Sequence, residues 1–368
     1  MTSRERVFKA IRREELPDRV PIQFDLSEPL IEAFSSKYGI PYKLNRSYYE
    51  DLTFRIGANS IRTKMGSDLV VVGGEAASGF KIVKDAEGAF VNEFGMKMRQ
   101  GPVYMDVVDA PLKEIESVEE AEAYQFPDPH DPSRYLQAEE DIAEYKEAYF
   151  IVGDVEVTLF AMVRQLVGME KLMIDMMMEA DYLPVLIKKS KEFSLGVATE
   201  LARRGVDAIW FGDDYGAQNN LLMSEETFRT FYKPAMAELI AGIKAVNPDI
   251  IIAQHCDGAV APLLDDFIEV GVDLFNPVQP GVPGHDPQEL KDRFGDRLSF
   301  WGALDQQYLL PMGTPEEIEA DVKEKIEILG KGGGYIISPA HILQSDTSME
   351  NVEAFINAAK KYGKYGNS

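Results

Sequence analysis

The fold class that the sequence predicts is an α/β fold, a (β/α)8 TIM barrel. Three observations predict it: eight short apolar runs recur, helical patterns separate most of them, and residues 1–368 suit a single barrel domain. Most runs are continuous rather than alternating, which is typical of strands buried on both faces of a parallel sheet. A doubly wound open sheet is the main alternative. The runs are residues 20–25, 67–73, 149–154, 207–214, 249–257, 272–278, 298–305 and 334–341.

The segments between the predicted strands carry helix signals, with one exception. Residues 314–330 show the clearest signals, because Thr314 stands at the N-cap position and Glu317 at the matching position of a capping box. The exception is residues 79–100, where strand-like runs flank the sequence "DAEG", which is typical of a hairpin turn. We therefore expect an antiparallel hairpin insertion after the second strand.

Composition excludes several classes of function. The formal net charge is −24, which opposes binding to nucleic acid or to an anionic membrane surface. The single cysteine excludes an intramolecular disulfide. The chain shows neither a signal-peptide core nor the roughly 18 consecutive apolar residues of a membrane span. We expect a cytoplasmic protein that acts on a small molecule.

Polar residues gather where the predicted strands end, which is where a (β/α)8 barrel places its active site. Carboxylates predominate among them, so the predicted mouth of the barrel is acidic. Of the adjacent pair Asp213 and Asp214, one side chain must point inward and the other elsewhere; Asp213 could instead brace a loop. We expect catalytic roles for Asp213, Asp214 and Glu156, and substrate contacts from Asp25, Asp68, Tyr215, Asn276, Gln279 and Asp305.

The stretch "IIAQHCDG" contains a candidate metal site. His255 and Asp257 are two residues apart, so in an extended segment their side chains project to the same side. If His341, at a later strand end, faces them across the barrel mouth, the three form a zinc site with an open position for substrate. The alternative is that both histidines are hydrogen-bonded residues of the rim that contact substrate without metal.

The remaining candidates for reactive side chains suit structural roles better. Cys256 should point away from His255 and Asp257, as a small buried residue packed behind the strand. A nucleophilic role would need a base and an exposed thiolate, for which the sequence gives no sign. His130 and His285 lie in polar loops, where we expect them to be exposed.

Several long stretches together resemble the uroporphyrinogen decarboxylase superfamily. They include "GVDAIWFGDDYGAQNNLLMSEETFRTFYKP", "HCDGAVAPLLDDFIEVGVDLFNPVQP", "FGDRLSFWGALDQQYLLPMGTPEEI" and "GGGYIISPAHILQSDTSMENV", and the resemblance covers nearly the whole chain. It implies a (β/α)8 barrel, in agreement with the strand count. It also implies one of two chemistries: decarboxylation of uroporphyrinogen without a cofactor, or zinc-dependent methyl transfer to or from a corrinoid protein.

The decarboxylase interpretation requires cations in the site, and the matching segment of this sequence is instead rich in carboxylates. The decarboxylase substrate carries eight carboxylates, so the site needs cations, and the resemblance implies paired arginines near the N-terminus. The matching segment here, "DRVPIQFDLSEPL", offers Arg19 but also Asp25 and Glu28. Asp68 matches the position of the catalytic aspartate in decarboxylases, and His341 matches their late histidine. Met162 stands where they have a tyrosine, and Asp214 stands near the position of a serine.

The methyltransferase interpretation fits better. The resemblance implies that zinc-dependent members which methylate a thiol carry a His-x-Cys pair and a later Cys; Asp257 and His341 stand at those two cysteine positions. His/Asp/His ligands would leave zinc a stronger Lewis acid than thiolates do, which suits an ether oxygen. We therefore expect an O-demethylase that passes a methyl group to Co(I) of a corrinoid-binding protein, with a homodimer possible. Another enzyme of the superfamily, a decarboxylase and a non-catalytic binding protein stay open.

Overall fold

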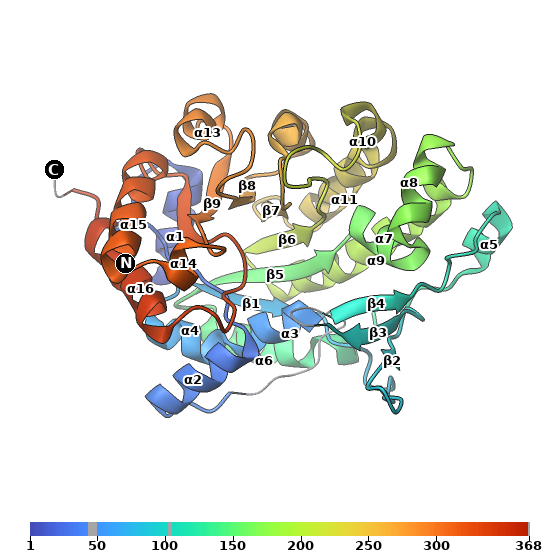
Figure 1. The fold of residues 1–368 in the computed structure, drawn as a ribbon, viewed down its shortest axis with the longest axis horizontal. Coiled ribbons are helices and arrows are strands. Elements are labelled where there is room, and N and C mark those ends of the chain that lie inside the picture. The colour runs from blue at the N-terminus through green and yellow to red at the C-terminus, as the bar shows by residue number, and fades with distance from the viewer. Residues whose placement is uncertain (43–49, 102–104, 367–368) are drawn as a thin grey trace.

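The main sheet contains seven parallel strands. The computed structural model describes residues 1–42, 50–101 and 105–366 (Figure 1). The spatial order β1-β5-β6-β7-β8-β9-β10 follows the chain, and every adjacent pair is parallel. All residues of these strands are buried, as expected for a sheet covered on both faces. Their bounds are Leu69–Gly73, Phe150–Val157, Ala208–Gly212, Ile251–His255, Leu274–Val278, Ser299–Leu304 and Tyr335–Pro339.

The first predicted strand closes the sheet without forming a regular ladder. Ile22 pairs with Ile337 of β10 in a single parallel bridge, and the Ile22 carbonyl accepts a hydrogen bond from the Asp68 amide just before β1. The segment therefore lies between the two edge strands, and the barrel predicted from the sequence is confirmed. The expectation of a regular strand over 20–25 is corrected, because Pro21 has no N–H and leaves the ladder broken.

Helices follow or precede the strands and cover the outside of the barrel. The capping box of Thr314 and Glu317 is present at the start of α15, as predicted, and the buried side of that helix carries Ile318, Val322 and Ile326. No described helix is both long and apolar enough to cross a membrane. The helices are α1 (Ser3–Arg12), α2 (Glu28–Tyr38), α3 (Glu50–Gly57), α4 (Asn59–Met65), α5 (Val118–Ala123), α6 (Leu136–Tyr145), α7 (Phe160–Val167), α8 (Met169–Met177), α9 (Leu183–Arg204), α10 (Glu225–Phe231), α11 (Lys233–Val246), α12 (Leu264–Val270), α13 (Pro287–Phe294), α14 (Leu309–Met312), α15 (Pro315–Leu329) and α16 (Met349–Tyr362).

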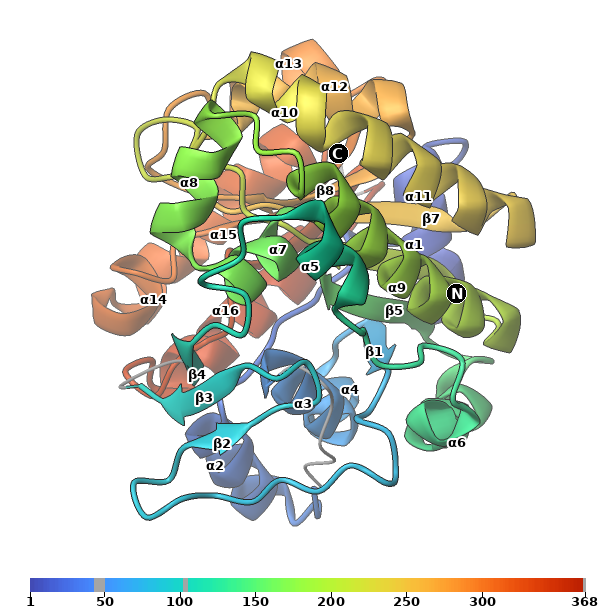
Figure 2. The ribbon, with the colours of Figure 1, turned by 90° about the vertical axis from the view of Figure 1, so that its right-hand side faces the viewer.

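The insertion after β1 is antiparallel, as predicted, but its turn differs. It contains β2 (Phe90–Val91), β3 (Lys97–Gln100) and β4 (Met105–Asp109), and Figure 2 shows them together at one side of the molecule. The β2–β3 turn lies at Asn92–Gly95 rather than at "DAEG", because the Asn92 side chain accepts hydrogen bonds from the amides of Phe94 and Met96. Residues 79–84 form no strand, which corrects that part of the expected hairpin.

Candidate metal centre

The structure brings His255, Asp257 and His341 together at the carboxyl ends of β7 and β10. One potential ligand atom from each lies within 4.8 Å of the other two. His255 Nε2 is 3.8 Å and His341 Nε2 is 3.9 Å from Asp257 Oδ2. The two strands lie three places apart in the sheet, so only the curvature of the barrel allows this approach. Two imidazoles and a carboxylate at these separations can surround one metal ion.

His255 is held so that one nitrogen faces this cluster. Its Nδ1 lies 2.7 Å from Asn276 Oδ1 on the neighbouring strand β8, and the Asn276 amide nitrogen is 3.5 Å from the Trp301 carbonyl oxygen. A carboxamide oxygen only accepts, so in the neutral imidazole Nδ1 carries the hydrogen and Nε2 presents a lone pair. The Trp210 ring packs edge-on against the imidazole at 5.3 Å. Asn276 therefore lies behind His255 and orients it.

The pKa values of the three side chains in the cluster are shifted in different directions. Burial lowers the pKa of His255, but the carboxylates of Asp257, Asp214 and Glu156 together raise it above its ordinary value. Burial and the neighbouring His255 lower the pKa of His341 to about 3. Burial raises the pKa of Asp257, although His255 opposes the rise. At neutral pH His341 is thus neutral and available as a ligand.

A polar cavity of about 400 Å³ opens directly onto the cluster. Asp257 and His341 form part of its wall, and Asp214 joins them with 37% of its side chain exposed. Asp214 Oδ1 accepts a hydrogen bond from the Asp257 amide at 2.8 Å and lies 3.9 Å from His255 Nε2. The other lining residues are Gly216, Ala217, Gln218, Gly258, Gln279, Pro280, Asp305, Gln306, Gln307 and Ala340. Two expected substrate contacts, Gln279 and Asp305, are therefore among the lining residues.

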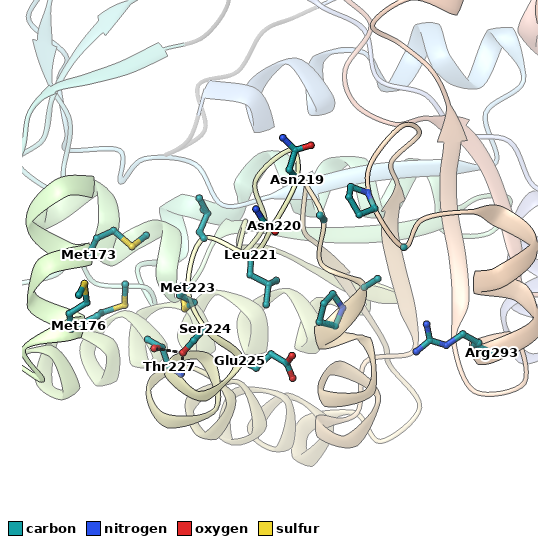
Figure 3. Close-up of a pocket in the computed structure, with 17 residues that line it drawn as sticks. Met173, Met176, Asn219, Asn220, Leu221, Met223, Ser224, Glu225, Thr227 and Arg293 are labelled. Carbon is teal, nitrogen blue, oxygen red and sulfur yellow. Dashed lines mark hydrogen bonds between the residues drawn. The ribbon is translucent and has the colours of Figure 1, made fainter.

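A larger cavity of about 1140 Å³ lies on the other side of the β6–α10 loop. Figure 3 shows methionines from α8 on one side of it, Asn219 and Asn220 on the loop, and Arg293 on the opposite side. None of the three candidate ligands lines this cavity. Of these two cavities, only the smaller, polar one is lined by candidate ligands.

Comparison with known proteins agrees with the fold and the site. The profile of the uroporphyrinogen decarboxylase (URO-D) family matches residues 91–362. The chain belongs to this family. It is similar to a uroporphyrinogen decarboxylase of Magnetococcus marinus, 26% identical over 44% of this chain and 43% of that protein. It is equally similar to the methylcobamide:CoM methyltransferase MtaA of Methanosarcina barkeri, 26% identical over 47% of each chain.

The family thus includes relatives with two activities, and each alignment spans less than half of the relative's length. A solved methyltransferase structure from Methanosarcina mazei has the same fold, with a TM-score of 0.73 over 98% of this chain and 99% of that one, at 18% identity. At that identity the structural likeness establishes the fold. The comparisons therefore establish the family and the fold of the chain.

Asp213 and Tyr215 do not face the cavity in this family member. The Asp213 carboxylate accepts hydrogen bonds from the amides of Leu159 and Ala161 and from the Thr158 hydroxyl, so it braces the loop between β5 and α7. The Tyr215 ring is fully buried among aromatic residues from the surrounding helices. The expectations of a catalytic Asp213 and a substrate-binding Tyr215 are corrected, because the chain turns both side chains behind the barrel wall.

Asp25, Asp154 and Glu156 lie beneath the histidines and are bound by two arginines that sequence reasoning misses. Arg55 forms ion pairs with Asp154 at 2.9 Å and with Glu156, and its Nε lies 3.5 Å from Asp25; Arg62 also binds Asp25. The Arg55 guanidinium stacks 4.0 Å from the Trp210 ring that contacts His255.

This network supports the histidines from below. Asp25, the expected substrate contact, and Glu156, the expected catalytic residue, are both bound by arginines within it. The signal that could have found the arginines is the count of carboxylates on buried strands, since such charges need cations. The two arginines stand seven residues apart, on the successive helices α3 and α4.

Asp68 lies at the opposite end of the barrel from the cluster. It precedes β1, and its buried carboxylate accepts hydrogen bonds from Arg6, Arg19 and Ser3. The expectation that Asp68 contacts substrate is corrected, because Asp68 stands where its strand begins and not where it ends.

Cys256 and His130 have the burial expected for structural residues, but His285 does not. Cys256 is fully buried and its sulfur accepts a hydrogen bond from the Tyr215 amide at 3.2 Å, as expected for a packed residue. The expectation that His285 is exposed is wrong: it is buried, with Nδ1 accepting from the Gln279 amide and its ring against Phe275. His130 is exposed, as expected, and pairs with Glu200.

Proposed function

We propose that this chain transfers a methyl group from an O-methyl donor to a corrinoid protein, with zinc held by His255, Asp257 and His341. The observation that carries the proposal is the convergence of these three side chains at the wall of a polar cavity. The similarity to the methylcobamide:CoM methyltransferase MtaA supports it at the level of the reaction class.

The donor atoms fit zinc. Two imidazole nitrogens and one carboxylate oxygen form a known type of three-ligand zinc site, which keeps a fourth position open. The hydrogen bond from His255 Nδ1 to Asn276 is the kind of outer contact that orients a ligand histidine. Cys256 does not compete as a ligand, because its sulfur lies behind the strand. Zinc bound here would act as a Lewis acid toward an ether oxygen, making its methyl group easier to transfer.

In the proposed reaction the bond between the methyl carbon and the ether oxygen breaks. Co(I) of the corrinoid supplies the electron pair for the new carbon–cobalt bond, and the pair of the broken bond stays on oxygen, which then takes a proton. Asp214 is the side chain we propose to deliver that proton, because it lies at the cavity wall beside His255 and Asp257. The backbone contact between Asp214 and Asp257 also fixes the position of the Asp257 loop.

The charge of the cavity supports methyl transfer over decarboxylation of uroporphyrinogen. Three carboxylates line it, and its described lining contains neither arginine nor lysine. Arg19, the cation that the N-terminal segment offered, binds Asp68 at the other end of the barrel. A substrate with eight carboxylates would therefore meet repulsion without compensating ion pairs.

Zinc stoichiometry and affinity test the proposal. We expect the purified chain to bind one zinc, and the His255→Ala variant to lose at least about 100-fold in zinc affinity. His130→Ala is the matched control, since His130 is an exposed histidine outside the cluster. Zinc-loaded protein should form methylcobalamin from Co(I) cobalamin and a methoxylated aromatic compound. Failure to bind zinc at saturating concentration, or conversion of uroporphyrinogen to a less carboxylated porphyrinogen, would overturn the proposal.

A further inference from the structure

We infer, on the basis of the proposed function, that the methyl donor is an uncharged methyl ether that also carries a hydroxyl group. We further infer that Asp305 and Gln306 bind this hydroxyl. Both residues follow β9 and line the same cavity as Asp257 and His341. The inference rests on the charge of the cavity wall, on the residue types in it and on two hydrogen-bond acceptors that the described protein does not use.

The charge of the cavity wall opposes an anionic donor. Asp214, Asp257 and Asp305 all line the cavity, and no described lining residue is a lysine or an arginine. The guanidiniums of Arg55 and Arg62 are paired with Asp25, Asp154 and Glu156 and do not line the cavity. A carboxylate on the donor would lose its hydration and meet like charges within the cavity.

The residue types in the wall also oppose a methylated ammonium donor. Sites that recognise quaternary ammonium groups surround the cation with aromatic rings. The described lining contains no phenylalanine, tyrosine or tryptophan, and four of its side chains are glutamines: Gln218, Gln279, Gln306 and Gln307. Carboxamides and carboxylates instead suit neutral polar groups that donate hydrogen bonds.

Two acceptors remain for a ligand after the internal hydrogen bonds of the wall are formed. Asp305 Oδ1 accepts from the amides of Gln307 and Tyr308 at 2.7 and 3.2 Å, which fixes the carboxylate. Asp305 Oδ2 receives no hydrogen bond from the described residues. Gln306 Oε1 is buried, and no donor in the described part of the chain reaches it.

A buried acceptor without a donor is costly, so a hydroxyl hydrogen from the ligand would satisfy it. Gln279 is not available in the same way, since its Oε1 accepts from the Gly258 amide at 2.7 Å. The cavity volume of about 400 Å³ suits a donor with a single ring. The class that meets all these conditions is a neutral, hydroxylated methyl ether such as a methoxyphenol.

Calorimetric binding of three matched probes to the zinc-loaded and zinc-free chain tests this inference. The probes are 2-methoxyphenol, methoxybenzene and 4-hydroxy-3-methoxybenzoate. We expect 2-methoxyphenol to bind about tenfold more tightly than methoxybenzene, which lacks the hydroxyl, and at least about tenfold more tightly than the benzoate. Gln306→Leu should remove most of the preference for the hydroxyl. Asp305→Asn should reduce the difference in affinity between 2-methoxyphenol and the benzoate.

Asp249→Asn is the matched control, because it removes one negative charge from an exposed site just before β7, at the far end of that strand. It should leave all three affinities unchanged. Equal or tighter binding of the benzoate, or no binding of any probe, would overturn the inference. If the chain binds zinc but transfers methyl groups best from the benzoate, the inferred donor class is wrong and the proposed function stands. If the chain binds the three probes in the expected order of affinity but does not bind zinc, the result contradicts the proposed function and leaves the inferred binding preference intact.

Discussion

The chemistry of this site is decided by which of three consecutive side chains faces the barrel mouth. His255 and Asp257 point to the cluster, and Cys256 between them points into the wall. The alternation follows from extended backbone geometry, so the sequence alone could assign these three sides. The same rule could not decide between Asp213 and Asp214, because it predicts only that the two differ. The structure shows Asp214 at the cavity and Asp213 beneath the β5–α7 loop.

At the same scale, Asn276 should control the affinity for metal without touching it. Replacing Asn276 with Ala removes the acceptor of the His255 Nδ1 hydrogen, so the imidazole loses its fixed tautomer and orientation. We expect zinc affinity to fall by about 10- to 100-fold, measured by competition with a chelator. Asn276→Asp keeps an acceptor and should retain affinity within a few-fold. Unchanged affinity in Asn276→Ala would show that the hydrogen bond does not orient His255.

At the scale of elements, two loops hold the site together by direct backbone contact. The β6–α10 loop carries Asp214 and the loop after β7 carries Asp257. A Cβ at Gly258 would lie 2.5 Å from the Gly216 carbonyl carbon and 2.8 Å from the Ala217 amide nitrogen. Such close approach leaves space only for glycine, so the spacing of the two carboxylates depends on these loops.

Gly258→Ala should therefore disrupt both stability and metal binding. Gly258 has φ +87°, and an alanine there would add left-handed strain to the clash with the neighbouring loop. Gly281 is the matched control, because it has φ +76° and a Cβ added there would meet no atom within 4 Å. We expect Gly281→Ala to cost about 1–2 kcal/mol in unfolding free energy and to keep zinc affinity. Gly258→Ala should cost more and weaken zinc binding; equal effects in urea unfolding and zinc titration would contradict this.

At the scale of the whole molecule, the sequence predicts the barrel better than it predicts which residues reach the mouth. Continuous apolar runs identify buried parallel strands, and seven of the eight runs are regular strands. A run does not show where its strand begins, so the sequence places Asp68 and Asp25 alike at strand ends. Partners distant in sequence are also invisible: Arg55 lies 99 residues from Asp154, and only the fold joins them.

Asp68 should stabilise the closed barrel rather than take part in chemistry. Its buried carboxylate binds Arg6 of α1 and Arg19 of the first segment, and it accepts a hydrogen bond from the Ile22 amide. Asp68→Asn leaves the Arg19 guanidinium without its counter-charge where the first segment meets β1, while Arg6 keeps its ion pair with Asp18. Loss of a buried partner typically costs about 3–5 kcal/mol of unfolding free energy. Urea unfolding should detect this loss, while zinc affinity stays unchanged because Asp68 lies at the opposite end from the cluster.

The control for this change is Asp265→Asn, which removes an exposed carboxylate that pairs with Arg297 at 3.1 Å. Exposed pairs contribute about 0–1 kcal/mol, so its unfolding midpoint should move little. The two variants remove the same charge, and only Asp68 lies between the ends of the sheet that must meet for the barrel to close. If Asp68→Asn kept full stability and zinc affinity but lost methyl transfer, Asp68 would act in the reaction and not in closure.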